Sequence, residues 1–429
     1  MEKIFIIGRS DDDYAKTLDA PLVHVPLISQ DEEIHDFIQN NLLNVDCDRF
    51  IICINDIKDI ILFLRIGLHI RLSEELLLKR FNPILYVSSF ITLDTAIKNG
   101  NIYGHLLSTK GCHFESAKTK EIIKEAISHI ESLNKNNYKR EFLDLISVLP
   151  DEKTGRHSIA NQWGAISLDK AANTGVFNSN EQLKKFTKFL YFKYIFALND
   201  NYSRIESTDL KILGHITLGK PDRIESNDYK ILLIDDEAEK GWESVLRKIF
   251  KTSKPENFQV IEEKVADYEG FSDRAKKLIT EGNFDLFLID LRLNGIDEET
   301  TLKPADFSGT KVLQQIKKFN MGNQVIIFTA SNKAWNMKYL LDEGARGYYI
   351  KESPEYNFTH NYSVENYTNF KKSVSDSFSL AFLRDISIIQ ERIIGFVSSD
   401  YLSKLPSYKS FYDRTIAFQG LAVKLLEKI

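Results

Sequence analysis

The stretch KILLIDDE, residues 230–237, decides the fold of the second half of the chain. Its apolar run is followed directly by two acids, Asp235 and Asp236. Three later apolar runs also end in a chemically active side chain: FDLFLIDLRL with Asp290, QVIIFTAS with Thr329 and GYYIKES with Lys351. Carboxyl ends of parallel strands meet at one edge of an open α/β sheet, so we expect these groups in one pocket. The pattern predicts a site for a divalent metal and a phosphoryl group.

The segment from Tyr229 to about Asn357 alternates apolar runs with amphipathic stretches. A further strand is expected at FQVIEEKV (258–265), and helices are expected at 241–251, 273–282, 310–319 and 336–344. The near-continuous apolar character of most runs is typical of a parallel sheet covered on both faces. We therefore predict a doubly wound, flavodoxin-like sheet of five parallel strands.

With these residues in this order, the segment resembles the receiver domain of two-component response regulators, over less than a third of the chain. The resemblance implies that Asp290 accepts a phosphoryl group from a phosphohistidine. It also implies that Asp236 and Asp290 bind Mg²⁺ directly, that the backbone carbonyl of Arg292 adds a ligand, and that Asp235 acts through water.

The resemblance assigns roles to three more side chains. Lys351 is expected to pair with the phosphoryl oxygens, and the hydroxyl of Thr329 is expected to hydrogen-bond the transferred group. Tyr348 matches the aromatic residue whose rotamer reports phosphorylation in the family. These residues complete the predicted site.

Two departures from the family pattern lie beside this site. The loop after Asp290 is lengthened by NGIDEETTLKPAD before Gly309. The proline that commonly follows the lysine is displaced to Pro354, behind Glu352 and Ser353. Neither change removes a chemical group, so we expect them to alter the lifetime of the phosphorylated state and the surface shown to partners.

Residues 1–133 also read as a doubly wound α/β domain. Strands are expected at EKIFIIG, PLVHVPL, DRFIICIND and NPILYVSS, with GHLLSTK (104–110) as a fifth, and helices at 31–43 and 59–81. The domain is interpreted as a degenerate, unphosphorylated receiver or as an unrelated α/β module.

The ends of these amino-terminal runs lack the chemistry of the second half. Gly8 and Arg9 stand where paired acids would be needed, although Asp11, Asp12 and Asp13 follow. The later runs end near other polar groups: Asn55, Asp56, Ser88, Ser89 and Lys110. The sequence predicts no phosphoacceptor here.

Residues 134–228 are predicted to be a mainly helical linker, with the clearest periodicity at 181–200 and a connection over 207–227. His157, near Asn161 and Trp163, is a candidate phosphohistidine. The alternative is a histidine that packs or hydrogen-bonds near a helix start.

Residues 358–429 are predicted to open with a polar stretch, HNYSVENYTN, and to continue as amphipathic helices around 374–397 and 415–429. Acidic and basic residues roughly balance there, so this segment does not show the excess of positive charge expected of a DNA-binding output domain. These helices are expected to pack on the receiver or on another protein.

The composition favours globular domains with hydrophobic cores and a protein whose partners are other proteins. The 429 residues are 43% hydrophobic and 27% charged, with a net charge of -5 and a pI near 6.1. Neither a nucleic-acid nor an anionic-membrane surface is indicated. The three cysteines lack metal-ligand spacing, and no run resembles a signal peptide or a membrane span, so a cytoplasmic location with reduced thiols is expected.

The sequence thus predicts a response regulator whose partners are a histidine kinase or phosphotransfer protein and an unidentified downstream protein. Output is expected through altered protein contacts of the flanking helices. Two alternatives stay open: an adaptor or phosphate sink without output, and a receiver-regulated enzyme in the amino-terminal domain. No catalysis beyond the receiver's own phosphorylation and dephosphorylation is indicated, and a homodimer is left open.

Overall fold

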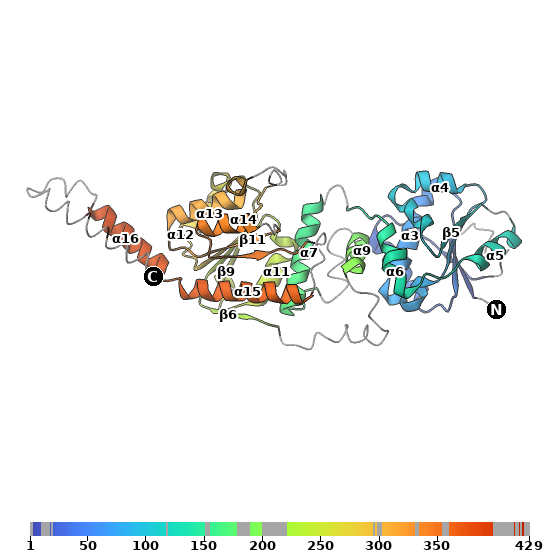
Figure 1. Ribbon diagram of the computed structural model, residues 1–429, viewed down its shortest axis with the longest axis horizontal. Helices are drawn as coiled ribbons and strands as arrows, with labels where there is room; N and C mark the ends of the chain where they lie inside the picture. Colours follow the sequence, from blue (N-terminus) through green and yellow to red (C-terminus); the bar gives the residue numbers. More distant parts are fainter. Residues whose placement is uncertain are drawn as a thin grey trace, which may run out of the picture. The chain divides into compact units, whose positions relative to one another are not determined.

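The computed structural model describes two compact units (Figure 1). The first unit comprises Met1–Ile159 and Phe177–Gly219, and the second comprises Ala160–Val176 and Lys220–Ile429. The described residues are 3–9, 18, 20–116, 119–150, 155–177, 189–199, 221–294, 297, 303–330, 334–353, 360–397 and the single positions 416, 420 and 423.

The first unit is built on a five-stranded parallel sheet in the order β2-β1-β3-β4-β5. Its strands are β1 (Ile4–Gly8), β2 (Leu22–His24), β3 (Arg49–Cys53), β4 (Ile84–Val87) and β5 (Cys112–Glu115). Phe50, Ile51 and Ile52 of the central β3 are wholly buried, because successive side chains face opposite covered surfaces of the sheet. The doubly wound α/β fold expected here is the observed one, and its strand order is flavodoxin-like.

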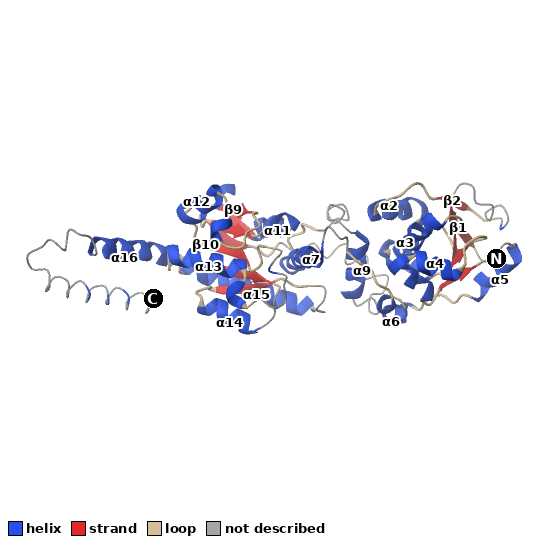
Figure 2. Ribbon diagram, turned by 90° about the horizontal axis from the view of Figure 1, so that it is seen from above, coloured by secondary structure: helices blue, strands red, loops and turns tan. Residues whose placement is uncertain are grey.

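Helices cover both faces of this sheet (Figure 2). The main ones are α2 (Asp31–Leu42), α3 (Ile60–Leu72), α4 (Leu93–Asn99), α5 (Lys120–His129) and α9 (Phe189–Asn199), and the short α6 (Tyr138–Glu141) follows α5. Helix α9 comes from the predicted linker, and its Leu190 and Ala197 join the core of this unit.

Two expected elements of the first unit are wrong. GHLLSTK is not a strand: residues 104–108 belong to a 3-10 segment, η3 (Asn101–Ser108), and the fifth strand is β5 (Cys112–Glu115). The expected helix over 59–81 ends at Leu72, because Ser73 is extended. A 3-10 segment, η2 (Glu74–Phe81), follows with Leu77 at φ 52°.

The second unit contains a parallel sheet in the order β12-β11-β10-β7-β9. Its strands are β7 (Ile231–Ile234), β9 (Phe258–Ile261), β10 (Leu286–Asp290), β11 (Val325–Thr329) and β12 (Gly347–Ile350). Counted along the chain this is the order 2-1-3-4-5, as in the first unit. A separate parallel pair joins β6 (Ile224–Asn227) to β8 (Phe250–Thr252).

Helices form a layer on each face of the second sheet (Figure 1). One apolar core receives side chains from α12 (Asp273–Glu281), α13 (Ser308–Phe319) and α14 (Ala334–Asp342). On the opposite face, an aromatic cluster joins α11 (Trp242–Ile249) and α15 (His360–Ser379) to the strands through Trp242, Phe328, Tyr349 and Phe370. Burial of four aromatic rings fixes these two helices firmly on the sheet.

The polar stretch at 360–369 is the first half of α15, within the region expected to be helical. Its few apolar residues lie on one helical face, where Tyr367, Phe370 and Val374 are at most 1% exposed. The predicted helix over 374–397 is divided, because α15 ends at Ser379 and α16 (Leu383–Val397) begins after a turn. The expected helix at 415–429 lies outside the described residues, apart from single positions.

Helix α7 (Gly155–Ala172) precedes the second sheet in the chain, and its residues from Ala160 onward belong to the second unit. His157 lies in this helix, and its side chain is outside the described part. None of the helices described is both long enough and apolar enough to cross a membrane.

Candidate functional site

Four strand ends of the second unit bring the predicted side chains to one edge of the sheet. Asp235 follows β7, Asp290 ends β10, Thr329 ends β11 and Lys351 follows β12. The strands are paired in parallel register, with Asp290 beside Phe328 and Thr329 beside Ile350. Sheet pairing therefore aligns groups that are more than 100 residues apart in the sequence.

Three carboxylates form the centre of this site. Asp235, Asp236 and Asp290 each place one oxygen within 4.8 Å of the others, and no other set of three or more His, Cys, Asp or Glu side chains in the described part of the chain is so compact. Asp235 is 1% exposed and Asp290 is 2% exposed. Burial and the charges of Asp290 and Asp235 raise the pKa of Asp236 to about 7.

Lys351 supplies the positive charge of the site. Its Nζ donates to Asp290 Oδ2 at 2.7 Å and to Asp235 Oδ2 at 2.9 Å, and the side chain is 3% exposed. Burial alone would lower the pKa of Lys351, but the two carboxylates raise it above its usual value. The ammonium ion therefore remains charged and compensates part of the buried negative charge.

The donor set fits a hard divalent cation. When all three carboxylates are ionised, they and one ammonium ion leave two negative charges, which a divalent cation would neutralise. Asp236 Oδ1 is buried and has no hydrogen-bond partner, so it is a carboxylate oxygen available as a ligand. Arg292 donates its backbone N–H to Asp290 Oδ1 at 3.3 Å, and the predicted role of its carbonyl stays a prediction.

Thr329 and Tyr348 complete the set predicted from the sequence. Thr329 is 2% exposed at the end of β11, and the Lys351 N–H donates to its carbonyl at 2.7 Å. Tyr348 is half-buried, whereas the neighbouring Tyr349 is wholly buried in the aromatic cluster. The switch role of Tyr348 remains a prediction.

Gly309 lets α13 begin directly against the phosphoacceptor candidate. A Cβ at this position would lie 2.1 Å from the Asp290 carbonyl oxygen and 2.7 Å from Leu291 Cα, so only glycine fits. The lengthened loop before it is anchored by Asp297, which is 4% exposed and accepts hydrogen bonds from Ser308. The insertion therefore leaves the close contact between strand and helix in place.

Sequence reasoning missed the part that α7 plays at this site. Asn161 hydrogen-bonds Lys351, Trp242 and Glu237, although it is separated from Lys351 by 190 residues. No local periodicity relates residues so far apart. The available signal was an asparagine and a glycine three positions apart, which a helix places on one face.

The corresponding edge of the first unit has a different chemistry. Arg9, directly after β1, pairs with Asp59 at 2.7 Å and donates to the carbonyls of Val25 and Pro26. A guanidinium thus stands where the second unit has paired acids. This arrangement disfavours a divalent cation at that edge.

The other polar groups noted in the first unit have local structural partners. Asp56 accepts from the Lys58 N–H, Ser88 Oγ accepts from the N–H groups of Phe90 and Ile91, and Lys110 pairs with Glu131 at 3.1 Å. The candidates Asp11, Asp12 and Asp13 lie outside the described residues. Asn55 and Ser89 also have partners within the protein.

A buried polar cluster lies between α2 and α3 in the first unit. Asp31 accepts from Arg65 and lies 3.4 Å from His69 Nε2. Burial alone would raise the pKa of Asp31, but His69 and Arg65 lower it to about 2. Burial lowers the pKa of His69 to about 4, although Asp31 opposes this shift. The cluster links two helices and contributes no open site.

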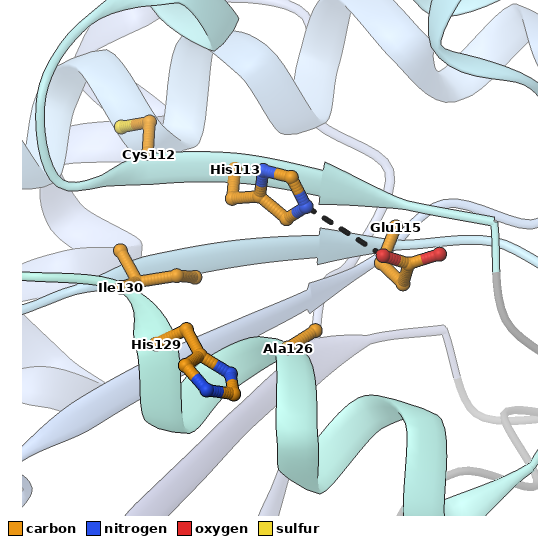
Figure 3. Close-up of a pocket in the computed structure, with 6 residues that line it drawn as sticks. All are labelled: Cys112, His113, Glu115, Ala126, His129 and Ile130. Atoms are coloured by element: carbon orange, nitrogen blue, oxygen red, sulfur yellow. Dashed lines mark ion pairs between the residues drawn. The ribbon is translucent and has the colours of Figure 1, made fainter.

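A hollow of about 350 Å³ lies at the edge of the first sheet, between β5 and α5. Figure 3 shows the side chains that line it. Its two imidazoles are already engaged: His113 lies 3.6 Å from Glu115, and His129 Nδ1 lies 2.8 Å from the Glu125 carbonyl. The side chains around it do not converge as metal ligands. We assign this hollow no function.

Comparison with known proteins gives a family match in the first unit. Residues 1–115 match the family described as "iREC: Inactive Receiver domain". Of the two interpretations of the amino-terminal domain, the degenerate receiver is therefore confirmed. No curated protein matches the chain as a relative.

Solved structures similar to this chain include three receiver domains. The signal receiver domain of the putative response regulator NarL from Mycobacterium tuberculosis is 17% identical and covers 35% of this chain and 98% of its own, with a TM-score of 0.22. The receiver domain of NtrX from Brucella abortus is 16% identical, with coverages of 34% and 98% and a TM-score of 0.21. The Francisella response regulator 1452 receiver domain is 20% identical, with coverages of 34% and 99% and a TM-score of 0.21. The strand order of each sheet, rather than these scores, defines the fold.

Proposed function

We propose that this protein is a response regulator that accepts a phosphoryl group on Asp290 and transmits the change through protein contacts. The observation that carries the proposal is the convergence of three carboxylates, of which Asp235 and Asp290 are paired with the ammonium group of Lys351 and Asp236 has an unpartnered buried oxygen. A structural ion pair would need only one acid for each lysine. The excess of buried acids is better explained by a cation-dependent reaction.

The proposed reaction is a phosphoryl transfer to a carboxylate. An oxygen of Asp290 attacks the phosphorus of a phosphohistidine, the P–N bond breaks, and its electron pair remains on the imidazole nitrogen, which then takes a proton from solvent. The product is an acyl phosphate. Such transfers depend mainly on positioning and charge neutralisation.

Each side chain has a defined task in this reaction. Lys351 lies 2.7 Å from Asp290 and is placed to donate to a phosphoryl oxygen. Thr329 at the neighbouring strand end supplies a hydroxyl for a second phosphoryl oxygen. Mg²⁺ held by Asp236 and Asp290, with Asp235 acting through water, would neutralise the remaining charge when bound.

The first unit has a different role in this proposal. With Arg9 at its strand edge and its match to inactive receivers, it acts as a binding module that is not phosphorylated. The phosphodonor is a histidine kinase or phosphotransfer protein. A downstream protein reads the phosphorylated state of the second unit.

The proposal is tested by incubating the full chain with acetyl phosphate and Mg²⁺ and measuring its intact mass. The wild type is expected to gain one base-labile phosphate, and chelation of Mg²⁺ is expected to prevent this. Asp290→Asn should gain none, whereas the matched control Asp273→Asn, an exposed acid of α12, should react as the wild type does. Absence of phosphate on the wild type would reject the function.

A further inference from the structure

Helix α7 contacts the acid site although it belongs to none of the strand and helix repeats of the second sheet. Asn161 Oδ1 accepts from Lys351 Nζ at 2.7 Å and from Trp242 Nε1 at 2.7 Å, and Asn161 Nδ2 donates to Glu237 Oε2 at 3.1 Å. Asn161 is 2% exposed. Its amide is therefore held by the same lysine that compensates the site's carboxylates.

Two further residues on the same face of α7 support this contact. A Cβ at Gly164 would lie 2.9 Å from Trp242 Cζ2 and 3.3 Å from Lys351 Cβ, so the glycine lets the helix backbone approach the lysine. Ser167 hydrogen-bonds the buried carboxylate of Glu352. Because Asn161, Gly164 and Ser167 are spaced by three residues, one helical face makes all these contacts.

Glu352 links the contacts of α7 to a departure from the family pattern, the absence of a proline directly after Lys351. The position after Lys351 carries a glutamate here, and its Oε2 also accepts from Ser363 Oγ of α15 at 2.7 Å. A proline could accept none of these side-chain hydrogen bonds. The glutamate at this position thus allows a contact between α7 and the edge of the site that a proline could not make.

The hydrogen-bond capacity of Lys351 makes this contact sensitive to phosphorylation. An ammonium group has three N–H donors, and Asp235, Asp290 and Asn161 occupy all three. A phosphoryl oxygen must replace one of these acceptors. All three bonds have an ionised donor, but the two carboxylates are ionised acceptors as well, so the bond to the neutral amide of Asn161 is the weakest of the three.

We infer that Asn161 docks α7 on the edge of the Asp290 site through Lys351, and that phosphorylation displaces it from Lys351 and undocks α7 from the second unit. Helix α7 is then the element that carries the output to a partner. The inference rests on the proposed function and identifies the segment that reads the site.

Amide hydrogen exchange of residues 160–172 in the full chain tests this inference. Acetyl phosphate with Mg²⁺ should make the α7 peptides exchange roughly tenfold faster, the change expected for losing one charge-assisted hydrogen bond. Intact mass of the same sample gives the phosphorylated fraction. Asp290→Asn should show slow exchange with and without the donor.

Three variants separate this coupling from a purely structural role. Asn161→Ala and Gly164→Leu should exchange fast before any phosphate is added, and phosphorylation should change them little. Both should still accept phosphate, because neither removes an acid, Thr329 or Lys351. Lys170→Ala, an exposed position on α7, should behave as the wild type does.

The outcomes distinguish failure of this inference from failure of the proposed function on which it rests. Phosphorylated wild type with unchanged α7 exchange overturns the inference alone, as does slow exchange in both Asn161→Ala and Gly164→Leu. Failure of the wild type to accept phosphate overturns both the inference and the proposed function.

Discussion

Lys351 is the residue on which the stability of the acid site depends. Its ammonium group lies within 2.9 Å of two buried carboxylates and 4.8 Å from the centroid of the Trp242 ring. A buried ion pair adds little net stability, but removal of one partner leaves an uncompensated charge. Loss of the lysine is therefore expected to lower the stability of the second unit, because two buried carboxylates would lose their counter-ion.

Lys351→Met is expected to destabilise the second unit by about 3–5 kcal/mol in the absence of divalent cations, because Asp235 and Asp290 lose their shared counter-ion. Urea unfolding followed by tryptophan fluorescence measures this change. Added Mg²⁺ should restore part of the loss. The exposed Lys311→Met serves as the control, and an equal, small effect in both variants would contradict the assignment.

His69 predicts a pH dependence for the first unit. Its folded pKa of about 4 lies below the ordinary value of 6.5, so between these values the unfolded chain binds a proton that the folded chain does not. The contribution of neutral His69 to the free energy of unfolding is fully present above pH 6.5. It is lost as the pH falls through about 4, and the total loss is up to about 3 kcal/mol.

Substitution of His69 checks this pH dependence. Urea unfolding of the full chain at pH 7 and pH 4.5 should show a smaller loss of free energy on acidification in His69→Gln than in the wild type. In the control variant His24→Gln, at an exposed position, acidification should lower the free energy of unfolding by as much as in the wild type. Equal pH dependence in all three proteins would exclude the assigned pKa shift.

At the scale of elements, the start of α13 determines the position of the strand end that carries Asp290. Gly309→Ala is expected to cost about 1–3 kcal/mol through overpacking, because its Cβ would contact backbone atoms that cannot move independently of β10. The same variant should slow phosphorylation by acetyl phosphate.

Gly270→Ala is the matched glycine control. Its Cβ would lie 3.3 Å from the side chain of Val265, which can move aside. Thermal unfolding of both variants gives the comparison. If Gly309→Ala were as stable and as reactive as Gly270→Ala, the close approach of α13 to Asp290 would be refuted.

At the scale of the whole molecule, two sheets of the same strand order carry different charged groups at their carboxyl edges. The first has Arg9 paired with Asp59, and the second has three acids around Lys351. One fold thus supports two proposed roles, a binding module and a phosphoacceptor, because function depends on the side chains at the strand ends.

The fold and much of the site follow from sequence because strand ends are local features. Asp290, Thr329 and Lys351 each end their own apolar run, and parallel pairing brings such ends together. The part played by Asn161 could not be predicted, since it depends on how α7 docks. GHLLSTK was misread because a short apolar run fits a strand or a 3-10 segment equally well.

The position of the transferred phosphate tests the central claim most directly. After reaction with acetyl phosphate and Mg²⁺, borohydride reduction converts a phosphorylated aspartate to homoserine, which peptide mass spectrometry locates. We predict conversion at Asp290 alone. Conversion at another aspartate, or none in a sample that has gained phosphate, would contradict the account.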